Sequence, residues 1–496
     1  MQSSASMLRF HLVVLMLLAV LALLWPAAVN SGPMMFPDTA AYVRAADGAI
    51  VKLTGHATAW TEETGRGAVQ AGAQAAVPPS KPILAGRSVY YGAMLYLGYI
   101  LGSFWLAAMV QALVAAVSIT LFMRRFQQGK DLRSMMTTAL VVAILAAATP
   151  VAFFSSYLMP DLFAGIAILA FAMLTCPQDG QRKGERLFWF LALAAACLFH
   201  SANLIIIAAM LSILVLLNVL RLLPISTVGL AAVAVALALG VVGEAGFSFA
   251  VKKATGTVPV RPPFITARII EDGPGYRYTQ EVCPKQPSSF QVCRYWKHMP
   301  RSYDRFLWDP DPRTGVFLAS SSAEQYVLSS EQARFALAVV AQYPVEQFLA
   351  TSKAALNQLS MIRLVGFNYQ QSMRDFFQRR LPAEEYAQLS HTSAFANRMP
   401  VRPTEILTLM LLAASLIVIF AYIRRTSFSD REGFSTADTL IVAIFCGLLV
   451  NAVVCGGLSV PDDRYQARVI WLVPLLASGL LCSLLKRQRG ASLREG

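Results

Sequence analysis

The sequence predicts an all-α, polytopic membrane protein of about ten transmembrane helices, with interfacial helices in a first outer loop and a large, mainly helical extracytoplasmic loop. Three observations lead to this fold class. The 496 residues are 56% hydrophobic and only 14% charged, with a mean hydropathy of +0.53, whereas a soluble domain has about 25% charged residues. Apolar residues form segments close to the length needed to cross a bilayer. Basic residues gather in the connections at one end of these segments.

The apolar segments and the charges between them predict the topology. The candidate spans are 8–28, 103–123, 135–154, 161–177, 187–200, 203–222, 225–249, 404–423, 436–457 and 468–485. Basic residues mark alternate connections: Arg9, Arg124, Arg125, Lys130, Arg133, Arg182, Lys183, Arg186, Arg221, Arg424, Arg425, Arg431, Lys486, Arg487, Arg489 and Arg494. By the positive-inside rule these connections and both termini are cytoplasmic, which indicates a multi-pass membrane protein. The net charge of +14 therefore sets orientation, and no nucleic-acid partner is expected.

The chain divides into three parts. Residues 1–250 form an N-terminal transmembrane core that includes the first outer loop, 29–102. We interpret the first span as a retained anchor, although Ala27-Ala28 gives it a weak cleavage-like ending. Residues 88–102 hold four tyrosines, a residue that favours the membrane interface, and form a helix on the outer leaflet. Counting that stretch as a span would put the arginine clusters outside.

The second outer loop, 251–402, is the extracytoplasmic loop domain, and residues 403–496 form the C-terminal transmembrane helices and cytoplasmic tail. Helical patterns begin at Ser322 and again at Pro344. Cys283 and Cys293 lie together in this polar loop. Because the compartment is oxidising, we expect them to form a structural disulfide.

The polar stretch that follows the first span carries the main candidate for chemistry. Pro37 suits the first turn of a new helix, and Asp38 follows it. One interpretation makes Asp38 a helix cap. The other makes it a base or metal ligand at the lipid–water boundary, acting on a substrate whose tail remains in lipid.

Other polar residues lie at the predicted outer ends of the spans, where ionisable groups are costly and usually functional. Each has an alternative interpretation: Asp161 as a helix cap, His200 as an interfacial histidine, and Arg464 as a partner of Asp462 or Asp463. Helix caps and ion pairs with a purely structural role would occur on both faces of the membrane, however, whereas these residues all lie on the outer face. An arginine can neutralise the charge of a leaving phosphate, and a carboxylate can act as the base for an acceptor hydroxyl. The outer face can therefore support group transfer from a phosphate-linked donor.

The layout resembles the GT-C superfamily of polyprenyl-phosphate-sugar-dependent membrane glycosyltransferases, which includes protein mannosyltransferases and lipid A aminoarabinose transferases. The residues that carry the resemblance are Phe36-Pro37-Asp38-Thr39-Ala40-Ala41-Tyr42, Gly86-Arg87-Ser88-Val89-Tyr90-Tyr91-Gly92, Gln111-Ala112-Leu113, Met159-Pro160-Asp161 and Arg464-Tyr465. They lie in residues 1–250 and 400–485, in an order and topology similar to the family's.

The resemblance implies a hexosyl- or pentosyltransferase whose active site is extracytoplasmic. Asp38 matches the first-loop catalytic acid and Asp161 resembles the second acidic position. The donor phosphate would be held by Arg464 with Arg87 or Lys81. Five further side chains would contact the sugar or the lipid: Tyr42, Tyr90, Tyr91, His200 and Tyr465. For Tyr42, Tyr90 and Tyr91 the alternative is a place in an interfacial aromatic belt.

The implied partners are a polyprenyl-phosphate-linked sugar, the lipid bilayer and an envelope acceptor, which is a lipid, glycan or protein. The candidate cofactor is a divalent cation, Mg²⁺ or Mn²⁺, but the first site has a single acid where related enzymes have a pair. A transporter or flippase of a lipid-linked sugar is the alternative function. Transporters more often show internal repeats and polar groups at mid-membrane, whereas here the polar groups lie at one end.

Overall fold

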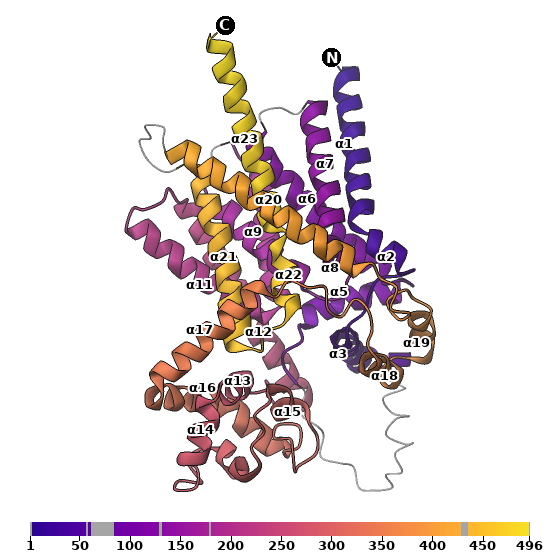
Figure 1. Cartoon of the computed structure of the whole chain (residues 1–496). Helices are drawn as coiled ribbons and strands as arrows, with labels where there is room; N and C mark the ends of the chain where they lie inside the picture. The colour runs from indigo at the N-terminus through magenta and orange to yellow at the C-terminus, as the bar shows by residue number, and fades with distance from the viewer. Residues whose placement is uncertain are drawn as a thin grey trace.

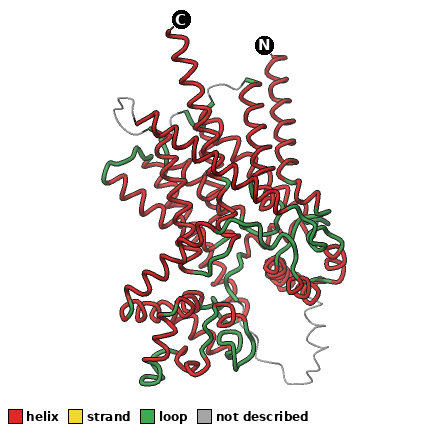
Figure 2. The backbone as a smooth tube through the Cα atoms, viewed as in Figure 1, coloured by secondary structure: helices red, strands yellow, loops and turns green. Residues whose placement is uncertain are grey.

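The computed structural model describes residues 2–55, 58–60, 84–127, 131–177, 180–427 and 435–495, and these are predominantly helical (Figure 2). The helices are α1 (Gln2–Leu23), α2 (Trp25–Val29), α3 (Pro37–Thr54), α5 (Val89–Ile100), α6 (Trp105–Phe126), α7 (Leu132–Ala148), α8 (Val151–Ser155), α9 (Leu162–Thr175), α10 (Lys183–Phe199), α11 (Ser201–Val219), α12 (Thr227–Thr255), α13 (Phe264–Asp272), α14 (Pro274–Glu281), η1 (Gln291–His298), α15 (Tyr303–Trp308), α16 (Ser322–Gln342), α17 (Pro344–Ser360), α18 (Gln371–Arg380), α19 (Ala383–Ser390), α20 (Val401–Ser427), α21 (Thr436–Leu458), α22 (Asp463–Ile470) and α23 (Leu472–Glu495).

Six of the described helices are long and apolar enough to cross a bilayer. They are α6, α11, α12, most of α20, α21 and the continuous stretch Asp463–Lys486 of α22 and α23. Shorter apolar helices are α7, α9 and the Phe10–Leu23 part of α1. The described part of the chain is therefore an all-helical, multi-pass membrane protein with six to nine candidate spans, fewer than the ten or so predicted.

Two of the predicted spans differ from the observed helices for identifiable reasons. The predicted span 135–154 is interrupted, because α7 ends at Ala148 and Pro150 precedes the separate helix α8. Proline lacks a backbone N–H and interrupts the hydrogen bonds of a continuous helix. The predicted span 187–200 belongs to α10, which has 17 residues and begins with charged residues at Lys183 and Glu185.

The first outer loop forms two helices that pack against each other, α3 and α5. At their closest approach a Cβ atom on Gly92 would lie 2.5 Å from the carbonyl oxygen of Tyr42, so this crossing requires glycine. Helix α5 has 12 residues, about 18 Å of helix, which is too short for about 30 Å of hydrocarbon. This length agrees with the prediction that residues 88–102 do not cross the membrane.

The second outer loop contributes to two apolar clusters. One cluster lies within 260–343 and includes Cys283 and Cys293, which are joined by a disulfide. Buried residues between Leu364 and Met399 belong instead to the large cluster of the transmembrane helices. Helix α17 joins the two regions by packing along the outer end of α21. The loop is therefore partly a separate unit and partly a cover over the membrane core.

The two termini lie at one end of the helical bundle, and α13 to α16 lie at the other, with α3 and α18 also away from the termini (Figure 1). We predict that this outer end faces away from the cytoplasm. Reporter fusions truncated after Gly315 and after Gly496 should be active only outside and only inside, respectively. Cytoplasmic reporter activity at Gly315 would contradict the predicted orientation.

Candidate functional site

Asp38 lies in the first turn of α3 but does not cap it. The N-cap is Phe36, whose backbone N–H donates to the Thr39 hydroxyl at 2.9 Å. The Asp38 carboxylate instead forms an ion pair with Arg87, just before α5, and both side chains are partly exposed. The interpretation of Asp38 as a cap is therefore wrong, and its carboxylate lies where a molecule from outside can reach it.

Backbone pairing brings the start of α3 beside the loop between α8 and α9. Met34 donates to the carbonyl of Ser156 and accepts from the N–H of Leu158, each at 2.9 Å. The Thr39 hydroxyl also donates to the Leu158 carbonyl at 2.9 Å. Residues more than 100 positions apart in the sequence are held together in this way, and the arrangement sets Asp38 close to the loop that ends at Asp161.

Asp161 is buried, with 2% of its surface exposed, at the N-cap position of α9. Its side chain makes no capping hydrogen bond to that helix, so the interpretation as a cap is wrong here too. The carboxylate accepts from Arg468 at 3.1 Å and lies 3.7 Å from Nε of Arg464. Asp161 is thus the anion between two arginines of α22.

Arg464 lies over the ring of Phe36, with 4.4 Å between its Cζ and the ring centroid, and contacts the ring of Tyr465 at 5.3 Å. Its Nε and Nη1 atoms are buried and make no hydrogen bond within the described residues. Asp462 does not pair with this side chain, because it caps α22 by accepting from the Arg464 backbone N–H at 2.8 Å. Asp463 accepts from the backbone of Arg363. The predicted alternative, a solvated ion pair within this loop, is therefore wrong.

Arg468 is a site residue that sequence reasoning missed. Besides Asp161, it lies within hydrogen-bond distance of Asn451 (3.4 Å) and Cys455 (3.3 Å). Its position one helical turn after Arg464 was the available signal, because residues four apart lie on the same face of a helix. Tyr157 was also missed: its ring contacts Phe36, and its buried hydroxyl has no hydrogen-bond partner within the described residues.

Three of the four tyrosines predicted to bind substrate, Tyr42, Tyr90 and Tyr91, lie on α3 and α5. Tyr42 and Tyr91 are buried and pack edge to face at 5.2 Å. The Tyr91 hydroxyl donates to Gln111, which in turn donates to the carbonyl of Tyr157. Tyr90 donates to the carbonyl of Gly243 at 2.9 Å. Tyr42 and Tyr91 therefore lie inside the protein rather than in an interfacial belt, and hydrogen bonds already occupy the hydroxyls of Tyr90 and Tyr91.

Four charged side chains lie within electrostatic reach of Tyr42. Burial raises the pKa of Tyr42, the charge of Asp38 raises it further, and Arg87, Asp161 and Arg464 also lie within electrostatic reach. Tyr42 is thus a neutral side chain within reach of four charged ones.

The three remaining predicted site residues have different outcomes. His200 caps α11, because its Nδ1 accepts from the N–H of Ala202 at 3.1 Å. Burial lowers the pKa of His200 to about 4, and the charge of Arg468 lowers it too, so this imidazole is neutral at pH 7. Tyr465 lies between the two arginines, since Arg468 contacts its ring at 5.0 Å. Lys81 lies outside the described residues.

The residues around Asp38 do not fit a divalent cation held by the protein. Such an ion takes several oxygen ligands, often more than one carboxylate. Asp38 is paired with Arg87 instead, and the described residues include no group of three or more His, Cys, Asp or Glu side chains that could hold a metal ion.

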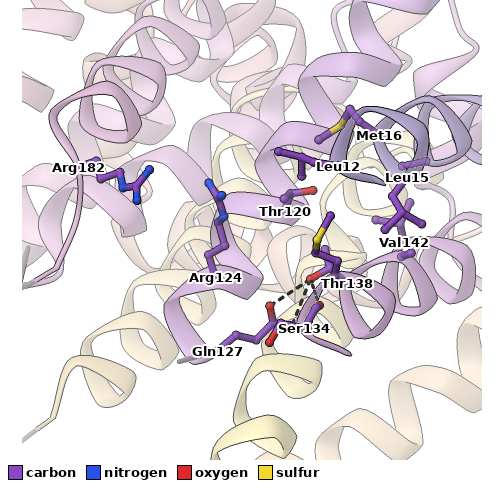
Figure 3. Close-up of a pocket in the computed structure, with 13 residues that line it drawn as sticks. Leu12, Leu15, Met16, Thr120, Arg124, Gln127, Ser134, Thr138, Val142 and Arg182 are labelled. Carbon is purple, nitrogen blue, oxygen red and sulfur yellow. Dashed lines mark hydrogen bonds between the residues drawn. The ribbon is translucent and has the colours of Figure 1, made fainter. Parts of the chain in front are cut away.

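Two cavities of the described structure lie away from these residues. One, of about 270 Å³, is lined by the turn before α6 and by α19, including Glu384 and Glu385. The other, of about 340 Å³, lies between α1, α6 and α7 on the side of the termini (Figure 3). Neither is lined by Asp38, Asp161 or Arg464.

Comparison with known proteins adds little to this geometry. No family model matches the chain, and no curated protein matches it. Among solved structures, the chain is similar to the crystal structure of ArnT from Cupriavidus metallidurans bound to undecaprenyl phosphate, with 13% identity over 97% of this chain and 79% of that chain, and a TM-score of 0.33. A TM-score of this size does not establish a common fold, so function is derived from the chain's own residues.

Proposed function

We propose that this protein is an integral membrane glycosyltransferase that moves a sugar from a polyprenyl-phosphate donor to an envelope acceptor on the extracytoplasmic side of the inner membrane. The observation that carries the proposal is the guanidinium of Arg464. It is largely buried, it lies beside Asp161 and over Phe36, and two of its nitrogens have no hydrogen-bond partner among the described residues. Buried polar groups are normally hydrogen-bonded, so these two nitrogens favour a bound anion.

The charge balance supports an anionic ligand. The ion pairs of the site join three arginines, Arg87, Arg464 and Arg468, with two aspartates, Asp38 and Asp161, and these five groups are called the constellation. Three positive and two negative charges leave one net positive charge. A phosphate-linked donor would neutralise it, and the unbonded hydroxyl of Tyr157 would add a neutral hydrogen-bond donor beside it. A planar guanidinium can bind two phosphate oxygens at once.

The proposed reaction is a single displacement at the anomeric carbon. An acceptor hydroxyl or amine forms the new bond to that carbon, and the bond from the carbon to the phosphate oxygen breaks. The polyprenyl phosphate leaves with the electron pair, and its negative charge is stabilised by Arg464 and Arg87. The acceptor's proton moves to the Asp38 carboxylate. If the Arg87 side chain moves away from Asp38 to contact the phosphate, the Asp38 carboxylate is free to act as the base.

Asp161 and Arg468 have a positioning role in this proposal. Both are almost fully buried, and their charged groups are directed toward each other and toward Arg464. They would hold the Arg464 guanidinium in one orientation, while Arg464 itself touches the donor. The second outer loop, which covers the site with residues 364–399, would contribute to acceptor choice.

Mass spectrometry of envelope glycans and lipids in a strain lacking the gene would test the proposal. We expect one acceptor to lose a sugar and the lipid-linked donor to accumulate in the outer leaflet, where periodate reaches it in intact spheroplasts. If the donor accumulates in the inner leaflet instead, the protein is a flippase, because the sugar never reached the outer side. An unchanged set of glycans and lipids would contradict both functions.

A further inference from the structure

The cavity between α1, α6 and α7 lies at the opposite end of these helices from Asp38. Helix α1 contributes apolar residues to its lining, α7 contributes both apolar and polar ones, and two arginines lie at one end, which we call the head end (Figure 3). The apolar lining residues are Leu12, Leu15, Met16, Ala19, Met135, Ala139 and Val142. The polar ones are Thr120, Arg124, Gln127, Ser134, Thr138 and Arg182. A volume of about 340 Å³ is within the range of ligand-binding sites.

Two arginines lie at the head end of this cavity, and the side chain of Arg182 extends toward that of Arg124 (Figure 3). Arg124 comes from the last turn of α6 and pairs with Glu185 at 3.5 Å. Arg182 precedes α10, and within the described part of the chain no carboxylate lies within ion-pair distance of its side chain. Arg124 and Arg182 are the charged side chains among the lining residues. Glu185 neutralises Arg124, so the lining keeps one positive charge that an anion would neutralise.

The remaining polar groups of the cavity are already satisfied by the protein. Thr138 donates to the Ser134 carbonyl and exchanges hydrogen bonds with Gln127. Ser134 donates to Asp131 at 2.6 Å, and Thr120 donates to the carbonyl of Ala116. An occupant therefore finds its polar contacts mainly at the two arginines, and the rest of the cavity offers it apolar surface.

The cavity lies beside exposed apolar surface of α1. Leu12, which lines it, is 38% exposed, and its neighbours Val13 and Leu17 are 58% and 59% exposed. Exposed apolar side chains on a membrane helix face lipid. A molecule with a hydrocarbon chain can thus enter sideways from the leaflet on the side of the termini, with its charged end at the arginines.

We propose that this cavity is a binding site for an anionic phospholipid of the cytoplasmic leaflet, with its phosphodiester between Arg124 and Arg182 and an acyl chain along α1 and α7. Basic pockets between membrane helices on this side bind anionic headgroups. One net positive charge matches the single charge of a phosphatidylglycerol phosphodiester better than a phosphate monoester, which carries about −1.5 to −2 charges. The site is separate from the transferase site and does not depend on that proposal.

Native mass spectrometry of the full chain, released from vesicles of equal parts phosphatidylglycerol and phosphatidylcholine, tests this site. We expect wild-type protein to retain phosphatidylglycerol selectively. Arg182→Gln and Arg124→Gln should each lower its retention roughly fivefold, while Arg133→Gln, which removes an exposed arginine nearby that does not line the cavity, should leave it unchanged.

A second variant and a second measurement cover the case in which an arginine variant fails to fold. Ala139→Phe keeps both arginines and fills the chain part of the cavity, so it should also lower retention. In thermal melts of the wild type, phosphatidylglycerol should raise the melting temperature more than phosphatidylcholine does. Equal retention of the two lipids, equal loss in Arg133→Gln, or displacement of phosphatidylglycerol by an equimolar polyprenyl monophosphate would each overturn the assignment.

Discussion

An Arg464→Lys protein is expected to fold normally and to bind the lipid-linked donor roughly ten- to a hundredfold more weakly, because it keeps the charge and loses the fork. Lysine carries a single ammonium, which cannot bind two phosphate oxygens in the plane of a guanidinium. Arg464→Ala should be weaker still, since it also removes the net positive charge of the constellation. Donor binding to the purified variants, measured together with their melting temperatures, checks this.

Arg468 provides the matched comparison, because its guanidinium is used by the protein. It bonds with Asp161 and lies within reach of Asn451 and Cys455. Arg468→Lys should therefore lower the melting temperature more than Arg464→Lys does, since a buried network loses partners. If Arg464→Lys binds donor as tightly as wild type and only its stability falls, then Arg464 is a structural counterion of Asp161, and the phosphate assignment is wrong.

The sequence predicted which face carries polar residues better than it predicted what each residue contacts. Topology placed Asp38, Arg87, Asp161 and Arg464 at the same ends of the spans, and in the structure all four lie within electrostatic reach of Tyr42. Topology is readable because it depends on local hydrophobicity and on the sign of the flanking charges, and neither requires knowledge of tertiary contacts.

Contacts between distant segments could not be read in the same way. The ion pairs of Asp161 with α22 join residues about 300 positions apart, and nothing local distinguishes such an aspartate from a helix cap. The N-terminus of α3 shows the same limit: Asp38 has the residue type of a cap, yet Thr39 bonds back to Phe36 and fills that role. Tyr157 and Arg468 were missed because their importance comes from partners that only the packed bundle supplies.

The division of the second outer loop is a further example. A single loop domain was predicted over 251–402, whereas the part from Leu364 to Met399 packs into the membrane core. One of its anchors is Tyr369, whose hydroxyl accepts from the backbone N–H of Met35 at 2.9 Å. This contact joins the last part of the loop to the segment just before Asp38, so the loop is part of the frame of the site.

Asp38→Asn is expected to lower transfer by about 10²–10⁴-fold, the usual scale for losing a general base, with little change in folding. The structure sets the folding cost. A carboxylate in the first turn of a helix contributes about 0.3–1 kcal/mol to the free energy of unfolding. The ion pair with Arg87 is partly exposed, and such a pair adds about 0–1 kcal/mol. Since the cap is Phe36 and not Asp38, no capping hydrogen bond is lost.

Asp304→Asn is the matched control for the first of these terms, the charge in the first turn of a helix. Asp304 is the second residue of α15, as Asp38 is of α3, and each is the acidic residue of its helix's first turn. Both substitutions remove a charge from the same helix position on the outer side of the protein. Similar small changes in melting temperature, with transfer lost only in Asp38→Asn, would assign the loss to chemistry at Asp38.

Asp38→Glu and Arg87→Gln then separate basicity from position. Glutamate keeps the carboxylate but moves it by about 1 Å, and displacements of this size are costly at a positioned site, so little activity should return. Arg87→Gln keeps the base and removes one cation, so it should mainly raise the KM for the donor while kcat falls less. A well-folded Asp38→Asn protein with wild-type transfer would mean that Asp38 serves only to hold Arg87, and the base would have to be another group near the Arg464 guanidinium.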